Sequence, residues 1–169
     1  NMSSQFLNLK NEEVKKDYMV ALRSFLEEER KNNSVIPSPQ LTFNHMVVCP
    51  FNRLKVVIIG SYPFLEQDYD GLAFSSKQIH APEENMNIIY EAYKDFFKVY
   101  EKAEAWPKAK LFPTNSLVAW AKQGVLLINS VYTCTMTNQK AHEGKGWEKF
   151  NETLISWLNE YDLPLVFIN

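Results

Sequence analysis

The stretch Leu54-Lys55-Val56-Val57-Ile58-Ile59-Gly60 decides the fold that the sequence predicts. It is a short, mainly β-branched apolar run closed by glycine, which is typical of a buried parallel strand that ends in a ligand-facing loop. A similar run, Val125–Ile128, stops at Asn129, and a third, Leu165–Ile168, lies at the end of the chain. The three runs indicate a small, mainly parallel sheet.

Helical patterns separate these runs. We expect helices over residues 12–31, where apolar side chains recur every four residues, and over residues 84–99, 116–122 and 148–160. Strands that alternate with helices predict an α/β fold. The sequence shows no internal repeat, low-complexity segment or linker, so residues 1–169 are expected to form one domain.

Composition predicts a globular protein inside the cell. Of the 169 residues, 46% are hydrophobic and 22% are charged, which suits a single core. No apolar run approaches the roughly 20 residues that cross a bilayer, and the N-terminus lacks the basic-then-apolar order of a secretory signal. The expected location is intracellular, either cytoplasmic or nuclear (nucleoid in a bacterium), without membrane contact.

The net charge of −2 restricts how the chain could bind DNA. Proteins that neutralise many phosphates carry a basic face, because the counterions that they release supply most of the non-specific affinity. Any such face must be local here. A tight, sequence-blind coat on DNA is therefore disfavoured.

Cysteine and histidine usage argues against a metal or cofactor. The cysteines, Cys49 and Cys134, are far apart and lack metal-ligand spacing, so both are expected to be buried thiols. The histidines, His45, His80 and His142, are equally scattered. We predict no metal and no cofactor.

Two loops that follow the first two strands hold the candidate binding residues. In a parallel sheet both loops open at the same edge, where ligands bind. Phe64 and Phe74 come after the first strand, and Asn129 ends the second. Two rings and an amide would suit a flat, hydrogen-bonding ligand such as a nucleobase. The same residues also fit ordinary core aromatics and a strand-end turn, so composition alone leaves both interpretations open.

Four segments in a fixed order make the chain resemble uracil-DNA glycosylases from about residue 18 to residue 169. The first includes Val35-Ile36-Pro37-Ser38-Pro39, Phe43, Pro50-Phe51 and the strand that leads to Gly60. The others are Gly71-Leu72-Ala73-Phe74-Ser75, the run from Trp120 to Asn129, and the run from His142 to Phe150. The resemblance implies the three-layer α/β sandwich of that family, with a short, mainly parallel central sheet.

The resemblance also implies roles for single residues. Phe74 would stack on a uracil flipped out of DNA, and Asn129 would read its polar edge. Phe64 would form the wall that excludes the methyl group of thymine. Three further residues become candidates for DNA contact, namely Ser75, Ser76 and His142.

The first motif departs from the family pattern. The family reads Gly-Gln-Asp-Pro-Tyr-His where this chain has Gly60-Ser61-Tyr62-Pro63-Phe64-Leu65. In the family the aspartate stabilises the cationic sugar and orients water, whereas a phenol with a pKa of ~10 is neutral. We expect the Tyr62 ring to turn inward against Phe64 or Phe74, into the cavity that Asn129 reaches. Substitute acids could come from Glu66, Asp68 or Asp70.

The second departure lies at the end of the sequence. The family continues to a His-Pro-Ser-Pro-Leu segment, whose histidine stabilises the departing uracil anion and whose leucine wedges into the duplex. These 169 residues do not include that segment, and a third strand so close to the end suggests a C-terminally incomplete fold.

These features lead to three hypotheses. The favoured one is an inactive or crippled relative that acts through binding of uracil or DNA (uracil-containing or single-stranded), or as a protein-binding component of a DNA repair or replication assembly. The alternative is an active uracil-DNA glycosylase with an altered motif. The third is a structural subunit that uses no pocket.

Overall fold

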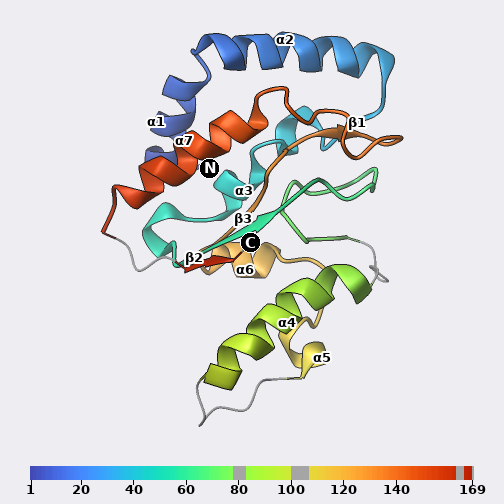
Figure 1. The fold of residues 1–169 in the computed structure, drawn as a ribbon. Coiled ribbons are helices and arrows are strands. Elements are labelled where there is room, and N and C mark those ends of the chain that lie inside the picture. Colours follow the sequence, from blue (N-terminus) through green and yellow to red (C-terminus); the bar gives the residue numbers. More distant parts are fainter. Residues whose placement is uncertain (78–82, 100–106, 163–165, 169) are drawn as a thin grey trace.

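The computed structural model describes residues 1–77, 83–99, 107–162 and 166–168, and its centre is a three-stranded parallel sheet of order β3-β2-β5 (Figure 1). The strands are β2 (Val56–Gly60), β3 (Val125–Asn129) and β5 (Val166–Ile168). In the register of β2 and β3, Gly60 lies opposite Asn129. The parallel sheet is therefore confirmed. Leu165, which the predicted third strand includes, lies outside the described residues.

One face of the sheet is covered by the helices drawn above it in Figure 1. These are α1 (Ser4–Glu13), α2 (Asp17–Asn32) and α7 (Trp147–Asn159), with the short α3 (Asn44–Val48) beside them. Their buried side chains join alternate residues of the strands in one core, which includes Phe6, Met19, Leu22, Met46, Val57, Leu126, Ile128, Trp147, Phe150 and Leu154.

The other face carries α4 (Glu83–Val99) and α6 (Val118–Lys122), with α5 (Lys108–Leu111) next to α4 (Figure 1). Ile58 and Leu127 point to this side, where they pack in a second core with Ile89 of α4 and Ala121 of α6. Successive strand residues thus face opposite cores, as the two-residue period of a strand requires. Helices on both faces produce the three layers that the sequence predicts.

The remaining elements support the loops. Strands β1 (Val35–Ile36) and β4 (Cys134–Thr135) form an antiparallel ribbon, and two short 3-10 turns, η1 (Pro39–Leu41) and η2 (Phe51–Arg53), flank α3. In the described part of the chain, no helix is both long and apolar enough to pass through a membrane.

The helix predicted over residues 12–31 corresponds to α2, whereas residues 12 and 13 end a separate helix, α1, that was not predicted. α1 ends at Glu13 and α2 begins at Asp17 after a tight turn, and the Glu13 side chain lies in the interior. There the carboxylate accepts hydrogen bonds from Tyr18 Oη at 2.5 Å and Thr153 Oγ1 at 3.0 Å. The apolar spacing continues across the turn, so periodicity alone could not reveal it.

Both cysteines are buried free thiols, as predicted. Burial raises the pKa of each thiol to about 12, which keeps it protonated and unreactive. Within the described ranges, no cluster of three or more His, Cys, Asp or Glu side chains could hold a metal ion. His80 lies outside those ranges.

Candidate functional site

The loops after β2 and β3 are joined at their first residues. The backbone N–H of Ser130 donates to Gly60 O at 2.9 Å, and that of Val131 donates to Ser61 O at 3.1 Å. The Ala73 N–H donates to Leu127 O at 3.2 Å, which brings the segment with Phe74 to the same edge. Three chain segments therefore meet at the carboxyl end of the sheet, where the sequence predicts a binding site.

Gly60 lies where the predicted ring and amide meet. A Cβ atom at Gly60 would be 2.5 Å from Asn129 Oδ1 and 3.3 Å from Phe74 Cε2. A Cβ atom at this position would displace the Asn129 amide and press on the Phe74 ring. Phe74 also has a φ of 64°, a left-handed conformation that is rare for bulky residues and often marks functional sites. Phe74 and Asn129 therefore lie beside the same glycine at the sheet edge.

The amide of Asn129 is paired with a residue that the sequence analysis did not single out. Its Nδ2 donates to Tyr69 Oη at 2.9 Å, and the exposed fractions are 6% for Asn129 and 2% for Tyr69. The Tyr69 ring lies 6.3 Å from the Phe64 ring, between centroids. Burial raises the pKa of the Tyr69 phenol well above its usual range, so it stays neutral. No motif marks Tyr69, because its position depends on the path of the whole loop.

The inward position expected for Tyr62 is wrong. Its ring is half-buried against the core on the α7 side, and its hydroxyl donates to Glu143 Oε1 at 2.8 Å. Lys140 Nζ lies 5.8 Å from the ring centroid. The bond to Glu143 raises the pKa of the Tyr62 phenol. A partner outside the cavity thus draws the side chain away from Phe64 and Phe74.

Two of the expected DNA contacts form part of the interior instead. Ser75 Oγ donates to Asp70 Oδ2 at 2.8 Å, and Ser76 Oγ donates to Glu66 Oε1. Ser75 and Ser76 are buried, so these side chains do not reach a DNA strand in this conformation. The same bonds hold Asp70 and Glu66, two of the acids considered as substitutes, inside the loop. Asp68 is exposed.

His142 is likewise an internal residue and not a surface contact. Its ring is completely buried, with Nδ1 2.8 Å from Thr133 Oγ1 and Nε2 3.1 Å from Glu29 Oε2. Burial lowers the pKa of the imidazole. The prediction that His142 contacts DNA is therefore wrong, because its side chain is buried, as are those of Ser75 and Ser76.

A residue of α7 holds the backbone of Asn129. Asn151 Nδ2 donates to Asn129 O at 2.7 Å and to Ser130 O at 3.2 Å, and Tyr132 Oη donates to Asn151 Oδ1. Buried polar groups with all partners in place make a site rigid. The sequence analysis did not predict this role of Asn151, because nothing in the pattern of an amphipathic helix shows that one of its polar residues bonds to a residue 22 positions away.

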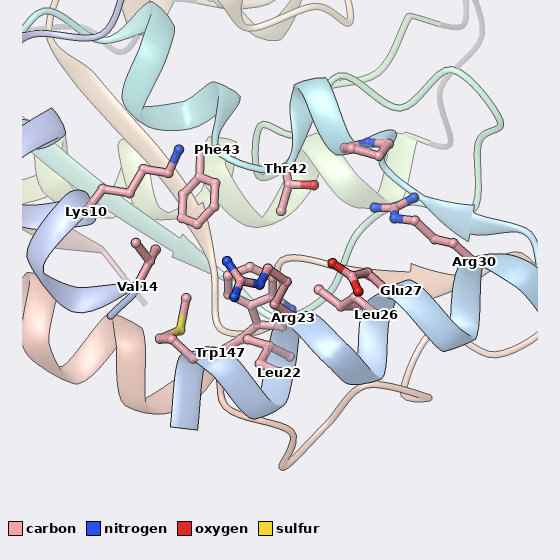
Figure 2. Close-up of a pocket in the computed structure, with 12 residues that line it drawn as sticks. Lys10, Val14, Leu22, Arg23, Leu26, Glu27, Arg30, Thr42, Phe43 and Trp147 are labelled. Atoms are coloured by element: carbon pink, nitrogen blue, oxygen red, sulfur yellow. The ribbon is translucent and has the colours of Figure 1, made fainter. Parts of the chain in front are cut away.

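A separate hollow lies between α2, α1 and the loop before α3 (Figure 2). Its volume is about 410 Å³. Apolar side chains, including Leu22, Leu26, Phe43 and Trp147, form much of its lining, and the charged residues that line it are Lys10, Arg23, Glu27 and Arg30. Figure 2 shows Lys10 and Phe43 on one side, Arg30 on the other, and Arg23 between them.

Known proteins share both the sequence and this architecture. A uracil-DNA glycosylase of Oceanobacillus iheyensis is 37% identical over 163 residues, which cover 95% of this chain and 66% of the relative. Another, of Geobacillus thermodenitrificans, is 35% identical over 170 residues, which cover 99% of this chain and 69% of the relative. The chain belongs to the uracil-DNA glycosylase family.

Solved members of the uracil-DNA glycosylase family confirm the fold. The mimivirus uracil-DNA glycosylase matches with a TM-score of 0.75 at 28% identity, over 96% of this chain and 58% of that one. A mimivirus UNG variant in complex with UGI matches with a TM-score of 0.76 at 27% identity, over 97% and 59%. No protein-family model matches the chain. The matched residues make up about two thirds of the length of the two curated relatives from Oceanobacillus and Geobacillus.

Proposed function

We propose that this chain is a uracil-DNA glycosylase relative that binds uracil or DNA through the fold of that family and excises uracil poorly or not at all. One observation carries the proposal: the loop after β2 presents Tyr62, bonded to Glu143, at the position where the family motif has a carboxylate. The proposed roles of Phe74 and Asn129 in holding a base, and of Phe64 as a wall, rest on their convergence at the sheet edge.

The chemistry explains why this exchange matters. Cleavage of an N-glycosidic bond builds positive charge on the sugar, and a nearby carboxylate stabilises that charge. A neutral phenol cannot, and the bond to Glu143 favours the neutral form further. Losing one preorganised electrostatic group costs about 10²–10³-fold in rate. Glu66 and Asp70 do not replace it, because internal bonds to Ser76 and Ser75 hold both carboxylates.

A strand-cleavage assay tests the proposal. The 169-residue chain is incubated with a single-stranded oligonucleotide that contains one uracil, and abasic sites are detected after alkaline treatment. We expect no release above buffer from the wild type or from Tyr62→Phe, which removes the Glu143 bond without adding a carboxylate. Tyr62→Asp should restore little release, because the added carboxylate supplies only one of several catalytic terms.

The opposite result would favour the alternative function. Clear release of uracil by the wild type, abolished by Asn129→Ala, would show an active glycosylase with an altered motif. Release that Asn129→Ala leaves unchanged would point to a contaminating enzyme, and the wild type would then be compared with the Asn129→Ala chain after further purification.

As a second candidate, we propose that the hollow beside α2 binds a protein segment that presents an apolar side chain next to a carboxylate. The lining combines an apolar floor with three cations and one acid, Glu27, although the whole chain has a net charge of −2. Arg30 is held by bonds to Val35 O at 3.2 Å and Pro37 O at 2.9 Å. Arg23 and Lys10 are the cations placed to meet an acidic partner.

Fluorescence anisotropy with short peptides tests this binding. The probe is a labelled Asp-Leu-Phe-Asp peptide, and Lys-Leu-Phe-Lys serves as the charge-reversed peptide. We expect Arg23→Glu to weaken binding of the acidic probe about tenfold or more, because like charges facing each other are strongly unfavourable. Lys122→Glu makes the same charge change at the end of α6 and should have no effect. Equal binding of both peptides would refute the proposal.

A further inference from the structure

The hydroxyl of Tyr69 lies on the hydrogen-bonding edge of Asn129. The Nδ2 group donates to it at 2.9 Å, inside a site where both side chains are almost completely buried. An amide that reads a base uses the same N–H to pair with a base carbonyl. The Tyr69 oxygen therefore takes the place of that carbonyl.

The rest of the Tyr69 side chain fills the adjoining space. Its ring lies near Phe64 (centroids 6.3 Å apart), while the Asn129 amide lies beside Phe74 at Gly60. A phenol ring is about as large as a pyrimidine. One flat ring with an oxygen on the amide already occupies the region where a second flat ring would have to bind.

The loop that carries Tyr69 also contains a buried carboxylate oxygen that has no hydrogen-bond partner in the described part of the chain. Glu66 is buried, its Oε1 accepts from Ser76, and its Oε2 has no hydrogen-bond partner among the described residues. A buried acceptor without a partner is unfavourable. Residues 61–77 contain no helix or strand, so opening of this loop would hydrate the carboxylate without breaking regular structure.

We propose that Tyr69 occupies the base position, so that the site accepts a uracil base only after Tyr69 leaves it. This inference rests on the proposed function of Phe74 and Asn129, and it names the residue that decides which ligands enter. Tyr69 competes with the base for one amide. Replacing it should open the site without any change to Phe74 or Asn129.

The test is an NMR titration of the isotope-labelled 169-residue chain with free uracil, followed at the side-chain amide of Asn129 and, in every variant, at the backbone amides of Gly60 and Phe74. We expect no shift in the wild type at ~10 mM uracil, and millimolar binding, at least ~10-fold stronger than in the wild type, in Tyr69→Ala. Stacking plus a neutral hydrogen bond supports no tighter affinity once the cost of ordering the ligand is included. Tyr69→Phe frees the amide but keeps the ring. Its amide signal should therefore move while its uracil affinity stays close to that of the wild type.

Matched variants keep the outcome decisive. Tyr69→Ala combined with Asn129→Ala should lose the gained affinity, and Tyr69→Leu replaces the alanine variant if the latter does not fold. Uracil binding by the wild type as strong as that of Tyr69→Ala, or Tyr69→Phe binding as strongly as Tyr69→Ala, would overturn the inference. Excision by the wild type would contradict the proposed function, but it would not equalise the affinities of these variants, so the two failures are distinguishable.

Discussion

Replacement of Gly71 by alanine is expected to lower the free energy of unfolding by about 2–5 kcal/mol, the sum of left-handed backbone strain and overpacking. Gly71 has a φ of +82°, and a Cβ atom there would lie 2.1 Å from the backbone oxygen of Leu41. Backbone atoms cannot move aside as a flexible side chain can. Because Gly71 begins the segment that positions Phe74, the substitution should disturb the site as well as the stability.

Gly144 provides the matched control for this prediction. Its φ of +72° is nearly the same, but a Cβ atom there would meet nothing within 4 Å. Gly144→Ala should therefore cost only the left-handed strain, about 1–2 kcal/mol. Urea denaturation of the two variants and the wild type measures both values. Equal losses for Gly71→Ala and Gly144→Ala would show that the close approach to Leu41 does not contribute.

The layers of the fold could be predicted because they depend on local patterns. The β-branched run that ends at Gly60 and the run that ends at Asn129 are both strands, and they pair in register at these two residues. Apolar spacing likewise located α4, α6 and α7 to within about two residues. Helix α1 and the turn that separates it from α2 escaped prediction because the apolar spacing continues through the turn, and the buried Glu13 carboxylate beside it leaves no trace in the periodicity.

The direction of each aromatic side chain in the site could not be predicted. Tyr62 turns toward Glu143, which is 81 residues away in the sequence, and Tyr69 toward Asn129, which is 60 residues away. Motif spacing identified the loop, but the choice between two tyrosines seven positions apart depends on partners that only the folded chain brings close. The prediction placed the Tyr62 ring in the cavity that Asn129 reaches, whereas the tyrosine bonded to the Asn129 amide is Tyr69.

The positions of the expected DNA contacts in the folded structure also could not be predicted. Ser75, Ser76 and His142 lie in segments that resemble the family, yet their side chains bond to Asp70, Glu66 and Thr133 in the interior. A motif preserves residues that build a loop as well as residues that touch a ligand. Sequence resemblance cannot separate the two groups, because burial is a property of the fold.

Acidification from pH 7 to pH 5 is expected to lower the free energy of unfolding by about 2 kcal/mol through His45 alone. This imidazole is 2% exposed, and burial lowers its pKa from 6.5 to about 3. A hydrogen bond with the backbone of Gly71 offsets only part of that effect. Its neighbours are aromatic: the Tyr132 ring lies 4.4 Å and the Phe43 ring 6.3 Å from it, between centroids.

The direction follows from the two protonation states. Between pH 6.5 and about pH 3 the unfolded chain binds a proton at His45 and the folded chain does not. Stability is therefore fully present above pH 6.5 and is lost as the pH falls, up to about 5 kcal/mol at the lower limit. His142 acts in the same direction, because burial lowers its pKa too. Asp70 opposes both, because burial raises the pKa of its carboxyl group.

Urea denaturation at pH 7 and pH 5 measures the effect, with His45→Gln as the variant that keeps a polar group but cannot titrate. The substitution itself will change stability at both pH values, so the informative quantity is the difference between them. That difference should shrink by about 2 kcal/mol in His45→Gln. It should shrink by a smaller amount in His142→Gln, because the wild-type His142 ring has a carboxylate partner, Glu29, which offsets part of the effect of burial. If His45→Gln loses as much stability between pH 7 and pH 5 as the wild type does, the buried imidazole of His45 is not the source of the acid sensitivity.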